Sequence, residues 1–207
     1  MDLADIEQEL EGDGPFREGR GKLSADQLDL IAEGVRLILR GLGEDPERDG
    51  LMDTPLRVSR MYADLCSGHD FNPTSFENTE HYSEMVLVSD IKFYSLCEHH
   101  MMPFFGYATL AYVPGDRLLG LSKLGRVVEQ YARRLQLQER LTEQIANALD
   151  STLAPTGIGV HICGEHLCMS ARGVQKPGHQ THTFALRGLI KEEPLRSEFL
   201  SRCTRGT

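Results

Sequence analysis

Between residues 85 and 190 the spacing of apolar residues changes twice, and this change limits the fold more than any other feature of the chain. Short runs rich in β-branched and aromatic residues predict strands. The central stretch 122–149 instead has apolar residues every three or four positions, which indicates two helices separated by a break near 135–137. The strand-like segments are 85–88, 91–96, 107–113, 158–163 and 181–190.

This order of strands, two helices and further strands predicts an α+β fold, in which antiparallel hairpins carry the helices on one face. In the segment 158–163, apolar residues alternate with Gly159, His161 and Cys163, so we expect a strand with one buried face. His161 lies opposite the apolar face, and we expect it to have a structural role.

Two further helices are predicted before the first strand. Ser24 and Gln27 have the spacing of a capping box, which begins a helix with a regular apolar stripe. Thr54 and Pro55 are interpreted as the N-cap and the first residue of a second helix. The connection 69–83 has no regular pattern and is predicted to be irregular.

The chain is therefore divided into four parts. An acidic, flexible arm is expected at 1–22 and a helical region at 23–84. The strand–helix–strand body is expected at 85–190, and a C-terminal tail at 191–207. The body carries enough apolar residues for one hydrophobic core.

The charge of the chain argues against two kinds of partner. The net charge is -9 at pH 7, whereas binding to nucleic acids or anionic membranes requires clustered Lys and Arg. No apolar run approaches the ~18 residues of a membrane span, and the acidic N-terminus is unlike a signal peptide. We therefore expect a cytoplasmic protein that binds neither nucleic acid nor membranes. A few basic residues in one cleft can still bind a small anionic substrate.

Two short motifs carry residue types that suit a metal site. Cys97 and His100 are three residues apart at the end of a predicted strand, and Cys168 follows a later strand. Two Cys and one His suit zinc, and three protein ligands leave one position for water, as in catalytic sites. His99 and His166 are adjacent and could serve as acid or base. The spacing alone equally allows Cys97 and Cys168 to be buried core thiols.

The other cysteines have no such context. The chain has five cysteines and no recognisable export signal, which indicates reduced thiols rather than disulfides. Cys66, Cys163 and Cys203 stand apart from other ligand-like residues, and we assign them no role.

Four segments resemble, in the same order, the signatures of the GTP cyclohydrolase I family. They are SLCEHHMMPFFG (95–106), GLSKLGR (120–126), QLQERL (136–141) and EHLCMSARGV (165–174). The resemblance covers roughly residues 24–190. The chain departs from the family pattern at Gly125, at Ala171, and at His179 and His182, which lie where the family has Ser and Thr.

This resemblance implies the tunnelling fold. In that fold, antiparallel sheets with two helices on one face join between subunits into a barrel, and the active sites lie at subunit boundaries. The implied assembly is a homodecamer of two pentamers. The resemblance also implies one Zn²⁺ per subunit, held by Cys97, His100 and Cys168.

The resemblance further implies a role for each of several residues. His166 is expected to protonate N7 of the purine while water activated by the metal attacks C8, and His99 is expected to handle a second proton. Gln138 and Glu139 are expected to bind guanine, since a carboxylate can accept from N1–H and the 2-amino group together. The residues expected to bind the ribose and triphosphate are Ser122, Lys123, Arg126, Arg172 and, with less support, Arg57.

The function implied is a GTP cyclohydrolase I, a zinc-dependent hydrolase acting on a cyclic amidine. It would convert GTP to 7,8-dihydroneopterin triphosphate and formate, the first step of tetrahydrofolate and pterin biosynthesis. One alternative is another enzyme of the same fold, a pterin synthase or a nitrile reductase, although no nicotinamide-binding motif is present. The other alternative is a zinc-stabilised oligomer that binds GTP without turning it over.

Overall fold

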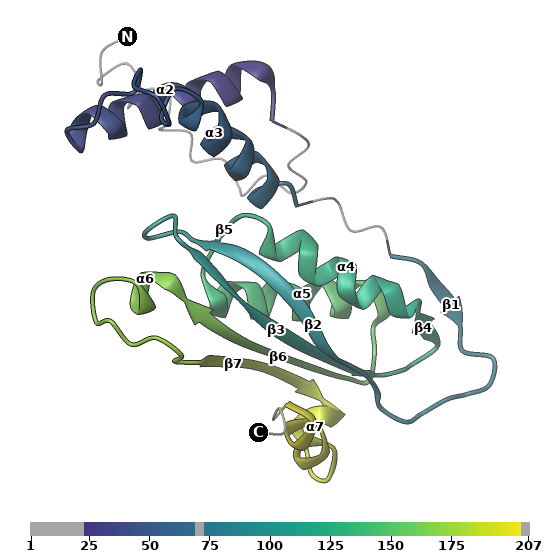
Figure 1. Ribbon diagram of the computed structural model, residues 1–207. Helices are drawn as coiled ribbons and strands as arrows, with labels where there is room; N and C mark the ends of the chain where they lie inside the picture. Colours follow the sequence, from purple (N-terminus) through teal and green to yellow (C-terminus); the bar gives the residue numbers. More distant parts are fainter. Residues whose placement is uncertain (1–22, 69–72, 204–207) are drawn as a thin grey trace, which may run out of the picture.

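The computed structural model describes residues 23–68 and 73–203, so the expected arm at 1–22 lies outside the described residues. A long curved sheet carries two helices on one face, and two further helices lie beyond its end (Figure 1). The elements are α2 Ala25–Gly41, α3 Thr54–Leu65, β1 Ser75–Glu77, β2 Val86–Cys97, β3 Pro103–Val113, β4 Arg117–Leu119, α4 Leu121–Ala132, β5 Leu135–Gln136, α5 Gln138–Leu153, β6 Gly157–His166, α6 Leu167–Ser170, β7 Thr181–Gly188, the 3-10 turn η1 Leu189–Lys191 and α7 Leu195–Cys203.

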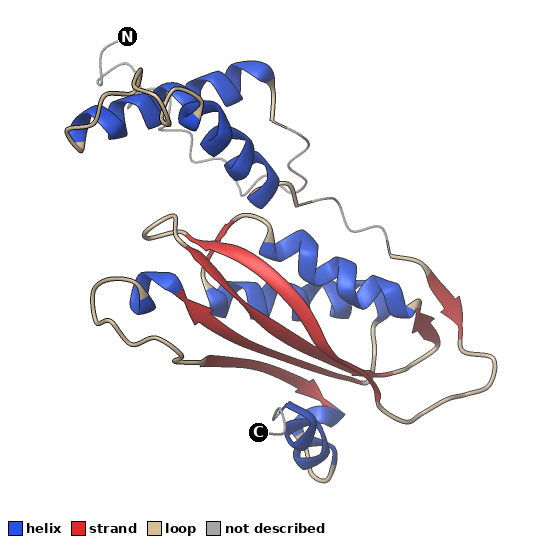
Figure 2. Cartoon of the chain, viewed as in Figure 1, coloured by secondary structure: helices blue, strands red, loops and turns tan. Residues whose placement is uncertain are grey.

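The main sheet has the strand order β5-β2-β3-β6-β7. The pairs β2–β3, β3–β6 and β6–β7 are antiparallel, and only the two-residue strand β5 pairs in parallel with β2. Figure 2 shows α4 and α5 together on one face of this sheet. The predicted α+β fold, with antiparallel hairpins and two helices on one face, is therefore confirmed.

The core lies between the sheet and these two helices. Alternate residues of β3 and β6 point into it, because successive side chains of a strand face opposite sides. The helices contribute Val127, Val128, Leu141 and Ile145, all fully buried, as helical periodicity predicted. None of the described helices is long and apolar enough to cross a membrane.

The helix starts differ partly from the expectations. The capping box of Ser24 and Gln27 is present, with both reciprocal hydrogen bonds. The N-cap of α3 is Asp53 rather than Thr54, one residue earlier than predicted. Helix α4 begins at Leu121, and the Gly120 carbonyl accepts from the Lys123 N–H at 2.8 Å, so Ser122 lies inside the first turn of the helix.

The segment predicted to be irregular contains a short strand. β1 pairs antiparallel with β4, with Ser75 opposite Leu119. The Arg117 side chain reinforces this pair, because its Nε donates to Ser75 Oγ at 2.8 Å. Three residues are too few for an alternating pattern to be recognised in the sequence.

The C-terminal segment, expected to be a tail, contains helix α7, which packs on the opposite face of the sheet. Its Phe199 is fully buried in a hydrophobic cluster with Ala111, Val113 and Ile190. A Cβ at position 159 would lie 2.9 Å from the Phe199 ring, so glycine is required on β6 for α7 to approach this closely.

Beside α7, the same face of the sheet buries a histidine. His161 is 2% exposed, and its Nε2 lies 2.9 Å from Nδ1 of His182 on β7. Its ring also stacks on Phe184, with 4.6 Å between ring centroids. Burial, aided by the nearby His182, lowers the pKa of His161 to about 4. These contacts agree with the structural role expected for His161. The prediction of a strand with one buried face is wrong, because residues 157–162 of β6 are all buried and the opposite face is covered as well.

This burial predicts a loss of stability in mild acid. A histidine in the unfolded chain titrates near pH 6.5, whereas the pKa of folded His161 is about 4. Between these values the unfolded state binds more protons, so stability falls as the pH falls. We expect this residue to lower the free energy of unfolding by about 2 kcal/mol between pH 7 and pH 5. Urea unfolding at both pH values should show this extra loss in the wild type but not in His161→Gln; equal losses would contradict it.

Candidate active site

Two motifs that are distant in the sequence meet at one end of the sheet. Cys97 is the last residue of β2, and His100 lies in the turn that leads to β3. Cys168 lies in α6, directly after β6. Because β3 and β6 are antiparallel neighbours with Phe104 opposite His166, the turn before β3 and the helix after β6 lie side by side.

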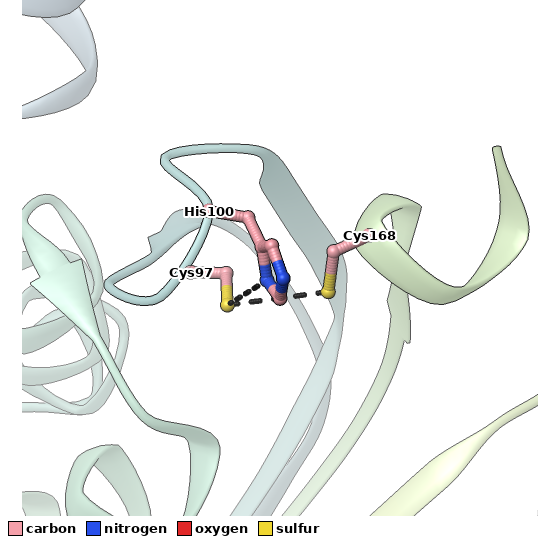
Figure 3. Close-up of side chains that lie close together, drawn as sticks. All are labelled: Cys97, His100 and Cys168. Atoms are coloured by element: carbon pink, nitrogen blue, oxygen red, sulfur yellow. Dashed lines mark hydrogen bonds between the residues drawn. The ribbon is translucent and has the colours of Figure 1, made fainter. Parts of the chain in front are cut away.

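The side chains of Cys97, His100 and Cys168 converge in this corner (Figure 3). Cys97 Sγ lies 3.9 Å from His100 Nδ1 and 4.0 Å from Cys168 Sγ. All three ligand atoms lie within 4.8 Å of one another. Two sulfurs and an imidazole nitrogen at this separation suit a tetrahedral Zn²⁺. Among the described residues no fourth ligand joins the group, which would leave one position for water.

The electrostatics of this corner also suit a bound cation. Burial raises the pKa of the Cys168 thiol, and the neighbouring Cys97 raises it further, since two thiolates repel each other. A metal ion relieves that repulsion and stabilises both deprotonated sulfurs. Arg172 lies at the rim, where its guanidinium donates to His100 Nε2 at 3.3 Å.

A salt bridge ties this corner to helix α5. Arg140 donates to both carboxylate oxygens of Glu98, at 2.5 and 3.1 Å, and each side chain is 28% exposed. This hydrogen bonding holds the pKa of the Glu98 carboxyl below its usual value. The pair therefore fixes the Cys97–His100 turn relative to the first turn of α5.

Loss of this salt bridge should weaken metal binding without removing a ligand. Glu98→Ala would free the turn that carries Cys97 and His100, and we expect zinc affinity to fall about 10-fold or more, as for other residues that orient ligands. Competition with a chromophoric chelator measures the affinity. Glu129→Ala is a matched control, since it removes the salt bridge between Glu129 on α4 and Arg133 directly after this helix. Equal affinities of the two variants would contradict the prediction.

His166 lies at the end of β6, close to the three ligand-like residues. Its ring stacks on Phe104, with 4.4 Å between centroids and 3° between planes. Its Nε2 lies 2.9 Å from Gln138 Oε1, and because that oxygen only accepts, Nε2 carries a hydrogen. Burial lowers the pKa of His166, His179 lowers it further, and Glu139 opposes both. His99, by contrast, is exposed in the turn beside His100.

Gln138 and Glu139 have different environments at the start of α5. Gln138 is 2% exposed, and its amide nitrogen donates to the carbonyls of Ile162 and Thr181 and to Thr183 Oγ1. Its polar atoms are thus engaged within the chain. Glu139 is exposed and close enough to His166 to influence its charge. The predicted guanine-binding role of both residues stays a prediction, and Glu139 is the one whose side chain is accessible.

Most of the residues predicted to bind the triphosphate are not brought to this corner. The C-terminal end of α4 lies near β2, since the carbonyl of Arg134, two residues after the helix, accepts from the Leu96 N–H. Ser122, Lys123 and Arg126 lie in the first two turns of the helix. A helix of 12 residues is about 18 Å long. Within one chain Ser122 and Lys123 are therefore far from the ligand-like group, whereas Arg126 lies near the middle of the helix. Of the residues predicted to bind the triphosphate, Arg172 is the one adjacent to the group.

Arg57 is also remote from this corner. It lies on α3 and forms a salt bridge with Asp53 at 2.9 Å. Both side chains line a small pocket with Asp49, Gly50 and Met52. The structure therefore offers no contact between Arg57 and the ligand-like residues of the same chain.

Three residues that support the site were not assigned a role from the sequence. Phe104 provides the surface on which His166 stacks. Glu165 accepts from Ser170 Oγ at 2.6 Å and from the Gly178 N–H at 3.1 Å, and so holds the loop after α6. His179, noted only as a departure, lies in this loop with its ring 6.5 Å from that of His166. Phe104 and Glu165 lie inside the family motifs 95–106 and 165–174, and this position could have identified them from the sequence.

The fold and this corner together define a class of protein, a tunnelling-fold protein with a Cys–His–Cys group that could bind a metal. Comparison with known proteins narrows the class. Residues 31–204 match the GTP cyclohydrolase I family. The chain belongs to the GTP cyclohydrolase I family.

Several relatives share about half of their residues with this chain. It is 55% identical to GTP cyclohydrolase 1 of Aquifex aeolicus over 171 residues, which cover 82% of this chain and 93% of the relative. It is 50% identical to GTP cyclohydrolase 1 of Chlorobium phaeovibrioides, with 86% and 82% covered, and 50% identical to that of Streptococcus thermophilus, with 85% and 97% covered. A crystal structure of the archaeosine synthase QueF-Like in the apo form is similar over 50% of this chain and 93% of its own, with 17% identity and a TM-score of 0.41.

Proposed function

We propose that this chain hydrolyses the imidazole ring of the guanine of GTP and releases 7,8-dihydroneopterin triphosphate and formate. The observation that supports this most is the convergence of Cys97, His100 and Cys168 beside His166. These residues come from two motifs at the ends of different strands, β2 and β6, and their ligand atoms lie within 4.8 Å of one another. The relatives named above carry the name of this activity.

The metal proposed is one Zn²⁺ per subunit, held by Cys97, His100 and Cys168. The two thiolates favour zinc over harder ions such as Mg²⁺, which prefer oxygen ligands. When bound, zinc supplies a water molecule acidic enough to attack C8 of guanine at neutral pH.

His166 is proposed to deliver the proton that purine N7 requires as the ring opens. Its Nε2 is held by Gln138 Oε1 at 2.9 Å, which leaves Nδ1 as the ring nitrogen that can release or take up a proton. Stacking on Phe104 and this hydrogen bond restrict the rotation of the ring. His99, exposed in the turn beside His100, is proposed as the second proton-handling group.

Glu139 is proposed to recognise guanine. Its carboxylate can accept from N1–H and the 2-amino group together, a pair of donors that adenine lacks. Gln138 is proposed to contribute mainly by positioning His166, because direct contact with guanine would require its bonds to Ile162 and Thr181 to break.

The remaining predicted contacts favour an active site shared between subunits. Arg172 is proposed to bind the triphosphate from the same chain as the zinc ligands. Ser122 and Lys123 lie at the opposite end of α4, a helix about 18 Å long, and Arg126 lies about one turn further along it, so we propose that a neighbouring subunit supplies all three. Exposed apolar side chains such as Tyr94 (52%) and Leu121 (64%) support an oligomer, which we propose is a decamer of two pentamers. Arg57 is proposed only as a peripheral contact.

Three further assignments belong to this proposal. The chain acts in the cytoplasm, at the first step of tetrahydrofolate and pterin biosynthesis. Its catalytic region is 85–190, and the helical region 23–84 packs beside it. The arm at 1–22 and the segment 191–207 lie outside the catalytic region.

The deciding experiment is incubation of zinc-loaded protein with GTP, followed by measurement of formate and of the pterin fluorescence that appears after oxidation of the product. Both signals should be lost on chelation and restored by zinc. Unchanged GTP in the presence of one zinc per chain would instead favour a protein that only binds the nucleotide. Activity on a pterin, or NADPH oxidation with a nitrile, would indicate a different enzyme of the same fold.

A further inference from the structure

A second group of reactive side chains lies outside the proposed active site, on the face of the sheet opposite α4 and α5. Cys163 on β6 is half-buried and lies opposite His182 on β7. The Sγ of Cys163 is 3.8 Å from His182 Nε2, within hydrogen-bonding distance for sulfur. The other ring nitrogen of His182, Nδ1, is 2.9 Å from Nε2 of His161. The three side chains are thus joined in series by two hydrogen bonds, from the thiol to the first imidazole and from there to the second.

The orientation of the His182 ring is restricted by His161. The two rings are nearly parallel, with 5.2 Å between centroids and 9° between planes, and a hydrogen bond joins their nitrogens. His161 is itself buried and stacks on Phe184, so it cannot turn freely. The His161–His182 hydrogen bond therefore fixes the ring orientation that directs Nε2 of His182 toward Cys163.

The protonation state of His161 sets the direction of the hydrogen bonds among these three side chains. Because the pKa of His161 is about 4, its ring is neutral near pH 7 and its Nε2 can accept the Nδ1–H of His182. Nε2 of His182 is then unprotonated and can accept the proton of the Cys163 thiol. After that transfer, the His182 imidazolium donates to the thiolate through Nε2 and to neutral His161 through Nδ1. This arrangement of nucleophile, base and orienting group is the general form of an activated thiol.

The same three residues do not fit a metal ion. Zinc bonds of about 2.0 Å at tetrahedral angles place two nitrogen ligands roughly 3.3 Å apart. Here the two facing nitrogens are 2.9 Å apart, which suits a hydrogen bond. Cys163 lies at the opposite nitrogen of His182, so the three donor atoms do not converge on one point.

We propose that Cys163 is a reactive thiol, activated by His182 and positioned through His161, that undergoes exchange with small disulfides. The Cys163 thiolate attacks one sulfur of the disulfide, the new S–S bond forms as the old one breaks, and the second sulfur leaves as a thiolate that takes up the proton from His182. The product is a mixed disulfide on Cys163, and a thiol reductant reverses the reaction. The small disulfide is the oxidant.

The test follows each cysteine of zinc-loaded full-length protein with 4,4′-dithiodipyridine at pH 6, where an ordinary thiol is almost wholly protonated. Rates for individual cysteines come from quenched samples analysed by peptide mass spectrometry. We expect Cys163 to react about fivefold faster than in His182→Gln, because a larger thiolate fraction outweighs its weaker nucleophilicity. The rates of Cys66 and Cys203 should be the same in both proteins.

Two further measurements make the result decisive. The melting temperature of His182→Gln shows whether this variant is folded. In His161→Gln the reaction rate of Cys163 should fall, while the exposure of Cys163 should stay the same. Slow reaction of Cys163 in both folded variants supports the proposal. A Cys163 rate that is unchanged in folded His182→Gln, or no faster in wild type than the rate of half-buried Cys66, overturns it.

Discussion

Cys168→Ser should lose both bound zinc and formate release while the fold is retained. Cys168 lies in a short helix near the surface of the sheet end, and a serine hydroxyl fits the same space, so we expect little change in stability. A neutral hydroxyl is a poor zinc ligand, and only Cys97 and His100 would remain. Residues that merely orient ligands change affinity 10–100-fold, so loss of a ligand should exceed about 100-fold.

Metal content after dialysis, measured by elemental analysis, is the direct readout, and formate release from GTP is the functional one. Cys66→Ser is the matched control, because it replaces a half-buried thiol directly after α3 and should change neither quantity. Formate release by Cys168→Ser without bound metal would refute both the ligand assignment and the zinc-dependent reaction.

Glu139→Gln should abolish most of the activity without loss of metal. The substitution replaces two carboxylate acceptors by one amide oxygen and one amide nitrogen that faces a guanine donor. A buried donor left without a partner in the complex weakens binding of the reacting state, and we expect kcat/KM for GTP to fall about 100-fold or more. The zinc content should equal that of the wild type, because Glu139 is not among the ligand-like residues.

Substrate selectivity separates this role from a structural one. Inosine triphosphate keeps N1–H but lacks the 2-amino group, so the wild type should prefer GTP and Glu139→Gln should lose much of that preference. Glu143→Gln, one turn along α5, is the control, since Glu143 is exposed and pairs with Arg187. An unchanged preference for GTP in Glu139→Gln would contradict its assignment to guanine.

Local patterns in the sequence predicted the secondary structure best where short-range interactions decide it. The capping box of Ser24 and Gln27 involves residues three positions apart. The alternation in β6 separates the residues that face α4 and α5 from those on the opposite face, although both faces are buried along most of the strand. Strand pairing between residues far apart in the sequence could not be predicted in the same way. The β1–β4 pair joins Ser75 to Leu119, and neither short strand has a pattern of its own.

The sequence likewise identified the chemistry of the site better than its geometry. The residue types at 97, 100 and 168 indicated a metal site, and the family motifs assigned them to zinc. The spacing could not exclude buried core thiols, because only the pairing of β3 with β6 brings Cys168 to within 4.0 Å of Cys97. The motif that contains Glu98 did not indicate Arg140 as its partner, 42 residues further on.

The sequence by itself determined the α+β class, the helix start at Ala25 and the family, since these follow from local periodicity, capping and ordered motifs. Only the tertiary structure decided which side chains meet. It brings together Cys97, His100 and Cys168 in one corner, joins Gln138 to His166, and links Cys163, His182 and His161 by hydrogen bonds. It also placed Ser122 and Lys123 far from that corner. The physical reason is that strand pairing and helix packing join residues tens of positions apart, and no local pattern records such a contact.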